Sequence, residues 1–316
     1  MRRRFSSLFV LLFACAQFSN AQEVKVPEYF KVDTLLSDSL RQFVRSVGLD
    51  STFNVGADGT EQVSFAVVDL DGAEPILGGV NYDNFIYPAS VYKIYVAMQV
   101  LKEIYSGDYF LTSPYVVRSP NAVDVGKQID WDPRPTLKDG DTVTINYLLD
   151  LMITRSDNSA ANCLIDVARR DSINQTMHDY GWYGSEVTRK FLGRDVEDSA
   201  YKTIRGTETC ALHAADFMYR VYTNQLVSPW VSMQMKALLG RQLDTTKISA
   251  GLPPNTMFYH KTGWWSFWTN DVGIVDNGKM KYIISCFTPV DEITAGPRMK
   301  ELSRKVFDLL KRRDGN

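Results

Sequence analysis

Apolar and polar positions change their spacing along the chain, and each spacing predicts a different element. Behind Pro27, apolar residues recur at helical intervals and predict a first helix over about residues 28–47. Further along they alternate with polar or small residues, which predicts two strands, over about residues 63–67 and 76–77, joined by a turn. The N-terminal part of the chain is therefore expected to supply one helix and part of a sheet.

The block after Pro88 is apolar almost all round, so it is expected to be a helix buried inside the protein. Ser90 and Lys93 interrupt its first turn and, being three apart, share one helix face. Burial lowers the pKa of an amine, and the positive end of a helix favours an oxyanion. The pair predicts an activated serine nucleophile. The alternative for this pair is a helix cap beside a lysine that reaches solvent.

The middle of the chain is helical, and its last third returns to strands. A helix over 145–153 is followed by a break at 154–157, where Ser156 or Asp157 suits the cap of the next helix. Further helices are predicted over about 160–169, 210–222, 230–239 and from Pro297 onward, and strands over about 257–264, 272–275 and 282–287. This order favours a sheet built from both chain ends around a helical insert.

Composition narrows the function without identifying it. The formal net charge of −2 over 316 residues gives no electrostatic reason to expect nucleic acid or an anionic surface as a partner. The four cysteines and three histidines are scattered and show no metal-ligand spacing, so a zinc enzyme is not expected, and neither is any other metal or a cofactor. Cys163 and Cys286 lie in apolar contexts and are expected to be buried thiols.

The N-terminal residues have the pattern of a secretory signal peptide. A triple-arginine start precedes a short apolar run, and small residues lead to a cleavage site after Ala21. The run is too short to span a bilayer. We therefore expect a periplasmic or secreted protein, and a monomer. Cys15 offers the alternative of a lipid anchor, although Phe13 is bulky for that motif.

Two further motifs accompany Ser90 and Lys93. Ser156-Asp157-Asn158 lies in the break between helices, and Lys261-Thr262-Gly263 lies in a late strand. S-x-x-K, S-D-N and K-T-G occur in this order, about 65 and about 105 residues apart, which resembles the class A β-lactamases and the related penicillin-binding proteins. The resemblance covers essentially the whole chain after Ala21.

The resemblance implies a β-lactamase/transpeptidase-like fold of the α/β (α+β) class. An antiparallel sheet of about five strands, flanked by the terminal helices, would pack against an all-helical subdomain, with the active site between them. After a signal peptide over 1–21, the catalytic domain would span 22–316. Its α/β part would take about 22–88 and 245–316, and its helical part about 89–244.

The resemblance also assigns roles that the chemistry of each residue supports. Ser90 would attack a lactam or amide carbonyl and become acylated, Lys93 would take or relay its proton, and Ser156 would pass a proton to the leaving nitrogen. Asn158 would bind a substrate amide or else brace the helix break. Asp157 is expected to cap rather than react.

The late strand would bind the rest of the substrate. Lys261 and Thr262 offer a positive charge and a hydroxyl to a substrate carboxylate, and Gly263 lets the substrate approach the strand closely. The backbone N–H groups of Ser90 and Trp264 would form the oxyanion hole. The aromatic run 264–268 lines the cleft or else packs within its hairpin.

One family feature is missing. Class A β-lactamases carry a glutamate, in a Glu-x-x-Leu-Asn pattern, that activates the deacylating water, and this pattern is absent near residues 192–195. Asp195 or Glu197 are the candidates to replace it, with Asp198 as a third. The alternative for each is a charged loop residue that is simply exposed to solvent. Deacylation is therefore expected to be slow or differently arranged.

Three functions follow. The first is a secreted serine hydrolase of the class A β-lactamase type that works through an acyl-enzyme. The second, favoured by the missing glutamate, is a D-alanyl-D-alanine peptidase or penicillin-binding enzyme with slow deacylation. The third is a protein that binds β-lactams or peptidoglycan without turnover, against which the intact serine–lysine pair argues.

Overall fold

The computed structural model describes residues 24–127, 129, 131–201, 203 and 206–313. The expected signal peptide and the alternative lipid-anchor cysteine lie outside the described residues. Within those residues, no helix is both long and apolar enough to cross a membrane.

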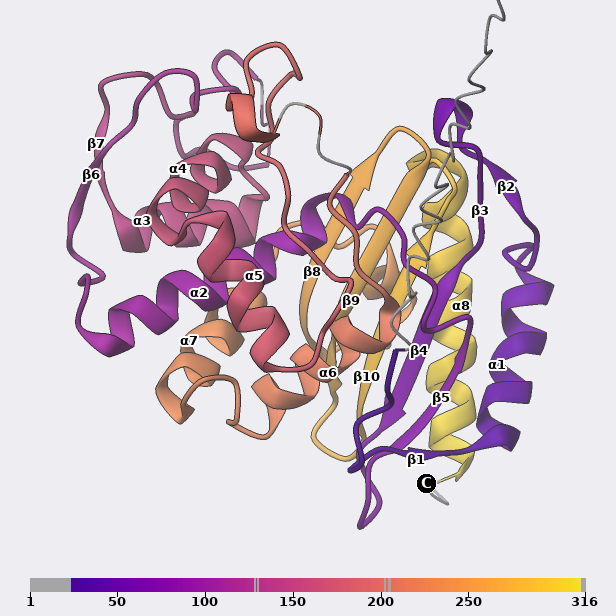
Figure 1. The fold of residues 1–316 in the computed structure, drawn as a ribbon. Helices are drawn as coiled ribbons and strands as arrows, with labels where there is room; N and C mark the ends of the chain where they lie inside the picture. The colour runs from indigo at the N-terminus through magenta and orange to yellow at the C-terminus, as the bar shows by residue number, and fades with distance from the viewer. Residues whose placement is uncertain (1–23, 128, 130, 202, 204–205, 314–316) are drawn as a thin grey trace, which may run out of the picture.

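A six-stranded sheet forms the centre of the α/β half, in the order β1-β5-β4-β10-β9-β8 (Figure 1). Its strands are β1 (Lys31–Val32), β4 (Ser64–Asp69), β5 (Ile76–Val80), β8 (Met257–Trp265), β9 (Trp268–Asp276) and β10 (Lys281–Thr288). The antiparallel sheet of about five strands needs one correction, because β1 adds a sixth strand parallel to β5. Two residues are too few to show an alternating pattern.

The sheet has apolar side chains on both faces, so both must be covered. In β4, Phe65 and Val67 belong to the core under the terminal helices, while Ala66 and Val68 belong to the larger core on the opposite face. This alternation follows from the two-residue period of a strand. One strand thus contributes to two hydrophobic cores.

The terminal helices α1 (Thr34–Ser46) and α8 (Glu292–Arg313) cover one face, as Figure 1 shows on its right side. The first helix begins at Thr34 and not near residue 28, because the side chain of Asp33 caps it by accepting from Leu36 N. The last helix begins at Glu292, so Pro297 lies inside it and does not open it.

The helical half covers the other face and includes a helix that the sequence did not predict. Its helices are α2 (Lys93–Ser106), α3 (Ile145–Asp150), α4 (Asn158–Ala168), α5 (Arg170–Asp179), α6 (Ala211–Tyr222) and α7 (Pro229–Leu239). The polar helix α5 follows α4 directly at Arg169, whose φ is +58°. Short strand pairs, β2 (Phe53–Asn54) with β3 (Thr60–Glu61) and β6 (Pro114–Val116) with β7 (Thr142–Thr144), complete the described fold.

The helix α2 runs through the middle of the helical half. Every residue from Lys93 to Leu101 is buried, as the all-round apolar pattern predicts. A 3-10 turn over Ala89–Tyr92 leads into it, so Ser90 lies just before the α-helix and Lys93 begins it. Cys163, Cys210 and Cys286 are all buried free thiols.

Candidate active site

Ser90 and Lys93 point toward each other at the start of α2. The Nζ atom of Lys93 lies 3.0 Å from Ser90 Oγ, within hydrogen-bond distance. Ala89, directly before the serine, has a φ of +45°, a conformation that costs free energy for a residue with a side chain. The turn thus holds the hydroxyl of Ser90 next to the amine of Lys93 at the N-terminus of the buried helix α2.

The surroundings of Lys93 favour its neutral form. Burial holds the pKa of this amine well below its ordinary value, and the nearby amine of Lys261 lowers it further. Nζ also lies 2.7 Å from Ser156 O and 2.8 Å from Asn158 Oδ1, both acceptors. A neutral amine has two N–H groups for these two oxygens, and its lone pair then accepts the hydroxyl proton of Ser90.

Ser156 reaches the same point from the break between α3 and α4. The last turn of α3 widens into a π-helical turn over Leu151–Arg155, and Ser156 follows with a φ of +61°. Asp157 then caps α4 by accepting from Ala160 N at 2.7 Å, which decides between the two expected caps. This geometry turns the carbonyl and the hydroxyl of Ser156 toward Lys93.

Lys261 approaches from β8 and completes the convergence. Its Nζ lies 2.9 Å from Ser156 Oγ and 2.6 Å from Thr262 O. Burial lowers the pKa of Lys261 to about 7, while the carboxylates of Asp244 and Asp271 act in the opposite direction. The amine therefore changes charge near neutral pH, and a substrate carboxylate would favour its charged form.

The strand β8 contacts the nucleophile through Gly263. A Cβ atom at this position would lie 2.7 Å from both Pro88 O and Ser90 N, which is closer than real Cβ atoms approach backbone. Only glycine fits without a shift. Gly263 thus brings the backbone of β8 against the turn that holds Ser90, one residue before Trp264.

Asn158 reaches Lys93 from the first turn of α4 and has a further partner that the sequence did not reveal. Its backbone N donates to Asp124 Oδ2 at 2.7 Å, and its side-chain Nδ2 lies 3.4 Å from Asp124 Oδ1. Asn158 therefore braces the break and also holds the amine of Lys93. Asp124 lies in a loop without periodic pattern, so no sequence signal pointed to it.

A model of the β-lactamase enzyme family matches residues 49–310. This chain belongs to the β-lactamase enzyme family. It is a serine β-lactamase-like hydrolase. A search of curated protein sequences found no match.

Solved structures with the same fold have low sequence identity to this enzyme. PBP-A is 19% identical with a TM-score of 0.73, over 91% of this chain and 100% of its own. The β-lactamase from Sphaerobacter thermophilus DSM 20745 is 21% identical with a TM-score of 0.72, over 86% and 97%. An ancestral class A β-lactamase is 20% identical with a TM-score of 0.69, over 87% and 99%.

The acids that could replace the missing glutamate lie on one loop but differ in burial. Glu197 is buried, pairs with Arg170 at 2.6 Å and accepts from Lys190 N at 2.9 Å. One of its oxygens thus holds the loop to α5, and the other closes the loop on its own backbone. Asp195 is exposed on the same loop, as is Asp198, which lies 3.1 Å from Arg170.

An aromatic side chain of this loop lies against the lysine of the β-lactamase-like site. The ring of Phe191 has its centroid 4.2 Å from Lys93 Nζ and stacks on Tyr92 at 4.9 Å. Sequence reasoning missed this residue, because an apolar side chain within a loop gives no chemical signal by itself.

The aromatic run 264–268 divides between the two expected roles. Trp264 and Trp265 are more than half exposed, at 53% and 63%, while Trp268 is buried and meets Tyr87 edge to face. Phe267 lies over Gly56. Trp268 is therefore a packing residue, and Trp264 and Trp265 face outward at the end of β8.

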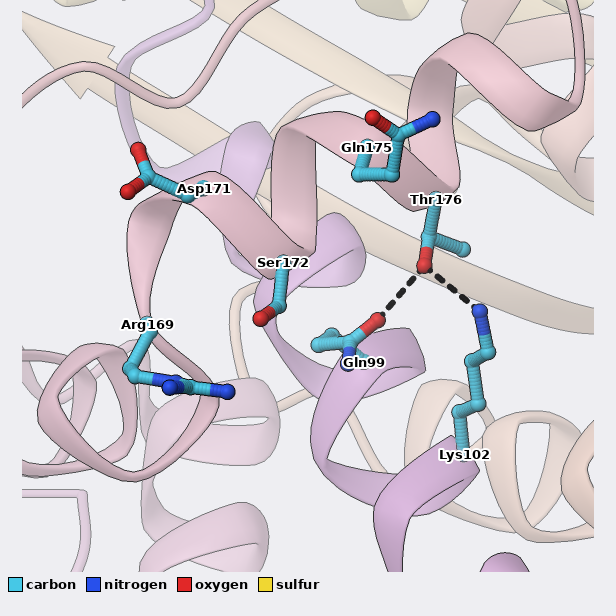
Figure 2. Close-up of a pocket in the computed structure, with 7 residues that line it drawn as sticks. All are labelled: Gln99, Lys102, Arg169, Asp171, Ser172, Gln175 and Thr176. Carbon is cyan, nitrogen blue, oxygen red and sulfur yellow. Dashed lines mark hydrogen bonds between the residues drawn. The ribbon is translucent and has the colours of Figure 1, made fainter.

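A cavity of about 530 Å³ between α2 and α5 is separate from these residues (Figure 2). The hydroxyl of Thr176 lies between Gln99 Oε1 at 2.7 Å and Lys102 Nζ at 2.9 Å, so these three side chains of the lining pair with one another. No residue of the three motifs lines this cavity. No cluster of three metal-ligating side chains occurs among the residues that the structure describes.

Proposed function

We propose that this enzyme opens the amide bond of β-lactams by acylation of Ser90. Oγ attacks the lactam carbonyl carbon while its proton passes to the neutral amine of Lys93. The C–N bond breaks, and the ring nitrogen receives a proton from Ser156. The observation that carries this proposal is the 3.0 Å contact between Ser90 Oγ and a buried lysine of lowered pKa.

The roles of Ser156 and Lys261 follow from their hydrogen bonds. Both amines lie within reach of Ser156 Oγ, at 3.3 and 2.9 Å. Lys261 can donate to it, and Lys93 gains a third N–H for it once it has taken the proton of Ser90. The hydroxyl proton of Ser156 is then available to the leaving nitrogen, and the amines supply a replacement. Lys261 in its charged form, together with Thr262, would bind the carboxylate common to these substrates.

A second candidate is a D-alanyl-D-alanine peptidase that β-lactams acylate for long periods. The observation that favours it is the neighbourhood of Lys93, where no carboxylate of the described residues hydrogen-bonds the amine. Both candidates share acylation and differ in the rate of deacylation. We also propose export to the periplasm or exterior, on the residues that precede Ala21.

The test follows turnover and intact mass of the purified protein with a chromogenic cephalosporin. We expect a covalent adduct that disappears in Ser90→Ala and forms at least 100-fold more slowly in Lys93→Arg, because an arginine stays protonated and cannot act as the base. Ser172→Ala, in the α2–α5 cavity, is the matched serine control and is expected to react as the parent does.

The outcomes separate the candidates. Sustained turnover supports the β-lactamase, and a long-lived adduct without turnover supports the peptidase. A protein that binds the compound with neither adduct nor turnover would contradict both and leave the binding protein as the function.

A further inference from the structure

A second cavity, of about 680 Å³, lies apart from the three motifs, and none of the motif residues lines it. Its walls come from the segment 24–29, from the segment 180–183 that follows α5, and from one side of α6. On α6 the lining residues His213, Asp216 and Arg220 are spaced by three and four positions, so they lie along one face of the helix. The volume is within the range of small-molecule sites in proteins.

The buried carboxylate in this wall has its hydrogen bonds from the protein itself. Asp216 is 1% exposed and accepts from Trp182 Nε1 at 2.7 Å and from Arg220 Nε at 3.1 Å. Its other oxygen accepts from the hydroxyl of Tyr29. Three donors thus already satisfy Asp216, so a ligand in the cavity is not needed to balance this charge.

A chain of buried hydroxyl groups leads to His213 and fixes the position of its proton. The hydroxyl of Tyr95 lies 2.9 Å from Thr209 Oγ1. Ser185 Oγ lies 2.8 Å from Thr209 Oγ1 and 2.8 Å from His213 Nδ1. Thr209 Oγ1 is the partner of the Tyr95 hydroxyl among the described residues, so each hydroxyl donates in the direction of the histidine. His213 Nδ1 therefore accepts, and the proton of the neutral imidazole is on Nε2.

This Nε2–H group has no acceptor in the part of the chain that the structure describes. His213 is 3% exposed and lines the cavity, and its one side-chain hydrogen bond there is that of Nδ1. Buried N–H groups in folded proteins almost always have an acceptor. The acceptor for Nε2 is therefore expected to be water or another molecule in the cavity.

The walls of the cavity favour an uncharged ligand with an aromatic body. Much of the lining is valine, proline and tyrosine: Val24, Val26, Pro27, Tyr29, Tyr180 and Tyr183. The charged residues of the lining are two of each sign, Lys25 and Arg220 against Glu28 and Asp216. Burial lowers the pKa of His213 to about 4, so its imidazole is neutral at pH 7 and adds no charge to this balance.

We propose that this cavity binds an uncharged aromatic compound whose carbonyl oxygen accepts a hydrogen bond from His213 Nε2. The tyrosine rings of the wall supply aromatic surface for the flat body of the ligand. The cavity and its lining are separate from Ser90, so the inference goes beyond the proposed function and does not depend on it.

The test titrates three small probes into the purified protein labelled with ¹⁵N-histidine and follows the imidazole signals by NMR. Benzamide carries the ring and the carbonyl oxygen, whereas benzoate and benzylamine carry the same ring with a negative or a positive charge. We expect benzamide to bind with a Kd of about 1 mM and to shift the Nε2–H signal of His213. Benzoate and benzylamine should bind about 10-fold more weakly, because the lining holds no net charge to attract them.

Two variants and a matched control locate the probe. His213→Phe keeps a flat ring and removes the donor, and we expect benzamide to bind about 10-fold more weakly, as measured by calorimetry. Tyr183→Ala serves if that variant fails to fold, because the side chain is 44% exposed, and its loss should weaken binding about fivefold. Tyr105 is an exposed aromatic residue outside this lining, stacked on Trp230. Tyr105→Ala should leave the Kd within twofold of the parent.

Equal binding of benzamide to the parent, His213→Phe and Tyr183→Ala would overturn the proposal. Binding of none of the three probes would do the same, since water would then be the only partner of Nε2. Tighter binding of benzoate or benzylamine than of benzamide would overturn the uncharged class of ligand.

Failure of the proposed function would appear in a different measurement. Benzamide at saturation should leave the rate of adduct formation at Ser90 within twofold of its value without the probe. Strong competition between the two would place benzamide at the motif residues and overturn the second site. A protein that forms no adduct with β-lactams would contradict the proposed function, while the calorimetric comparison of parent and variants would still decide the role of His213.

Discussion

At the scale of single residues, the reaction depends on the charge states of two buried lysines, Lys93 and Lys261. Lys93 must be neutral to take a proton, whereas Lys261 must be charged to bind a carboxylate. Burial lowers the pKa of both amines, and the nearby amine of Lys261 lowers the pKa of Lys93 further. The site therefore works in the pH range where one amine has lost its proton and the other has kept it.

The pKa of Lys261, about 7, predicts a falling limb in the pH profile. Below that pH the amine is charged and binds an anionic substrate; above it the charge is lost, so kcat/KM for a carboxylate-bearing β-lactam should fall as pH rises through about 7. Steady-state rates between pH 5 and 9 test this. In Lys261→Arg the charge persists, and the falling limb should move out of the range. An unchanged limb in that variant would show that another group titrates.

The break between α3 and α4 is the element on which the site depends most. Asp157 caps α4, and its other oxygen lies 2.8 Å from Arg155 Nη2, in an ion pair that is almost fully buried. Arg155 also donates to Arg134 O at 2.7 Å, which joins the break to the neighbouring loop. The left-handed conformation of Ser156 is held between these contacts.

Removal of this cap should cost more than the removal of an ordinary cap. Asp157→Ala removes the cap of α4 and the nearer of two carboxylates that pair with the buried guanidinium of Arg155, while Asp132 at 3.5 Å remains. We therefore expect a loss of about 3 kcal/mol in the free energy of unfolding, from the cap together with a buried charged hydrogen bond. Ser228 caps α7 by accepting from Val231 N and takes part in no ion pair with a buried charge. Ser228→Ala should lose only about 1 kcal/mol in urea denaturation. Equal losses in the two variants would argue against a role for the ion pair.

At the scale of the whole molecule, the two halves meet where β8 passes the turn that holds Ser90. Gly263 sets this distance, because its missing Cβ lets two backbones approach. At this spacing Lys261 from the sheet lies 2.9 Å from Ser156 Oγ of the helical half. The active site is therefore a property of how the halves are joined.

The substitution Gly263→Ala should move the two halves of the molecule apart. A Cβ at 2.7 Å from Pro88 O and Ser90 N forces the strand away from the turn, and we expect acylation to slow about 100-fold or more. Gly72→Ala is the control, because its Cβ would meet nothing closer than 3.4 Å and its change in stability should stay within about 0.5 kcal/mol. Adduct formation and thermal melting measure both. A Gly263→Ala enzyme that acylates at the parent rate would show that the halves adapt.

The sequence predicted what periodicity and short motifs encode. The three motifs indicated which residues converge, and the alternation over about residues 63–67 predicted the strand that lies at Ser64–Asp69. Helix α5 was missed because its polar composition gives a weak apolar stripe, and β1 because two residues carry no period. Phe191 and Asp124 were missed because their positions depend on loop conformations set by distant contacts, which no local pattern records.

The order of strands has a consequence for the stage of synthesis at which the active site can form. Strand β4, near the beginning of the chain, pairs along one edge with β10, near its end. During synthesis from the N-terminus that edge waits for its partner until the last third has emerged, and Lys261 arrives only then. The active site around Ser90 is therefore complete only when the polypeptide is almost finished.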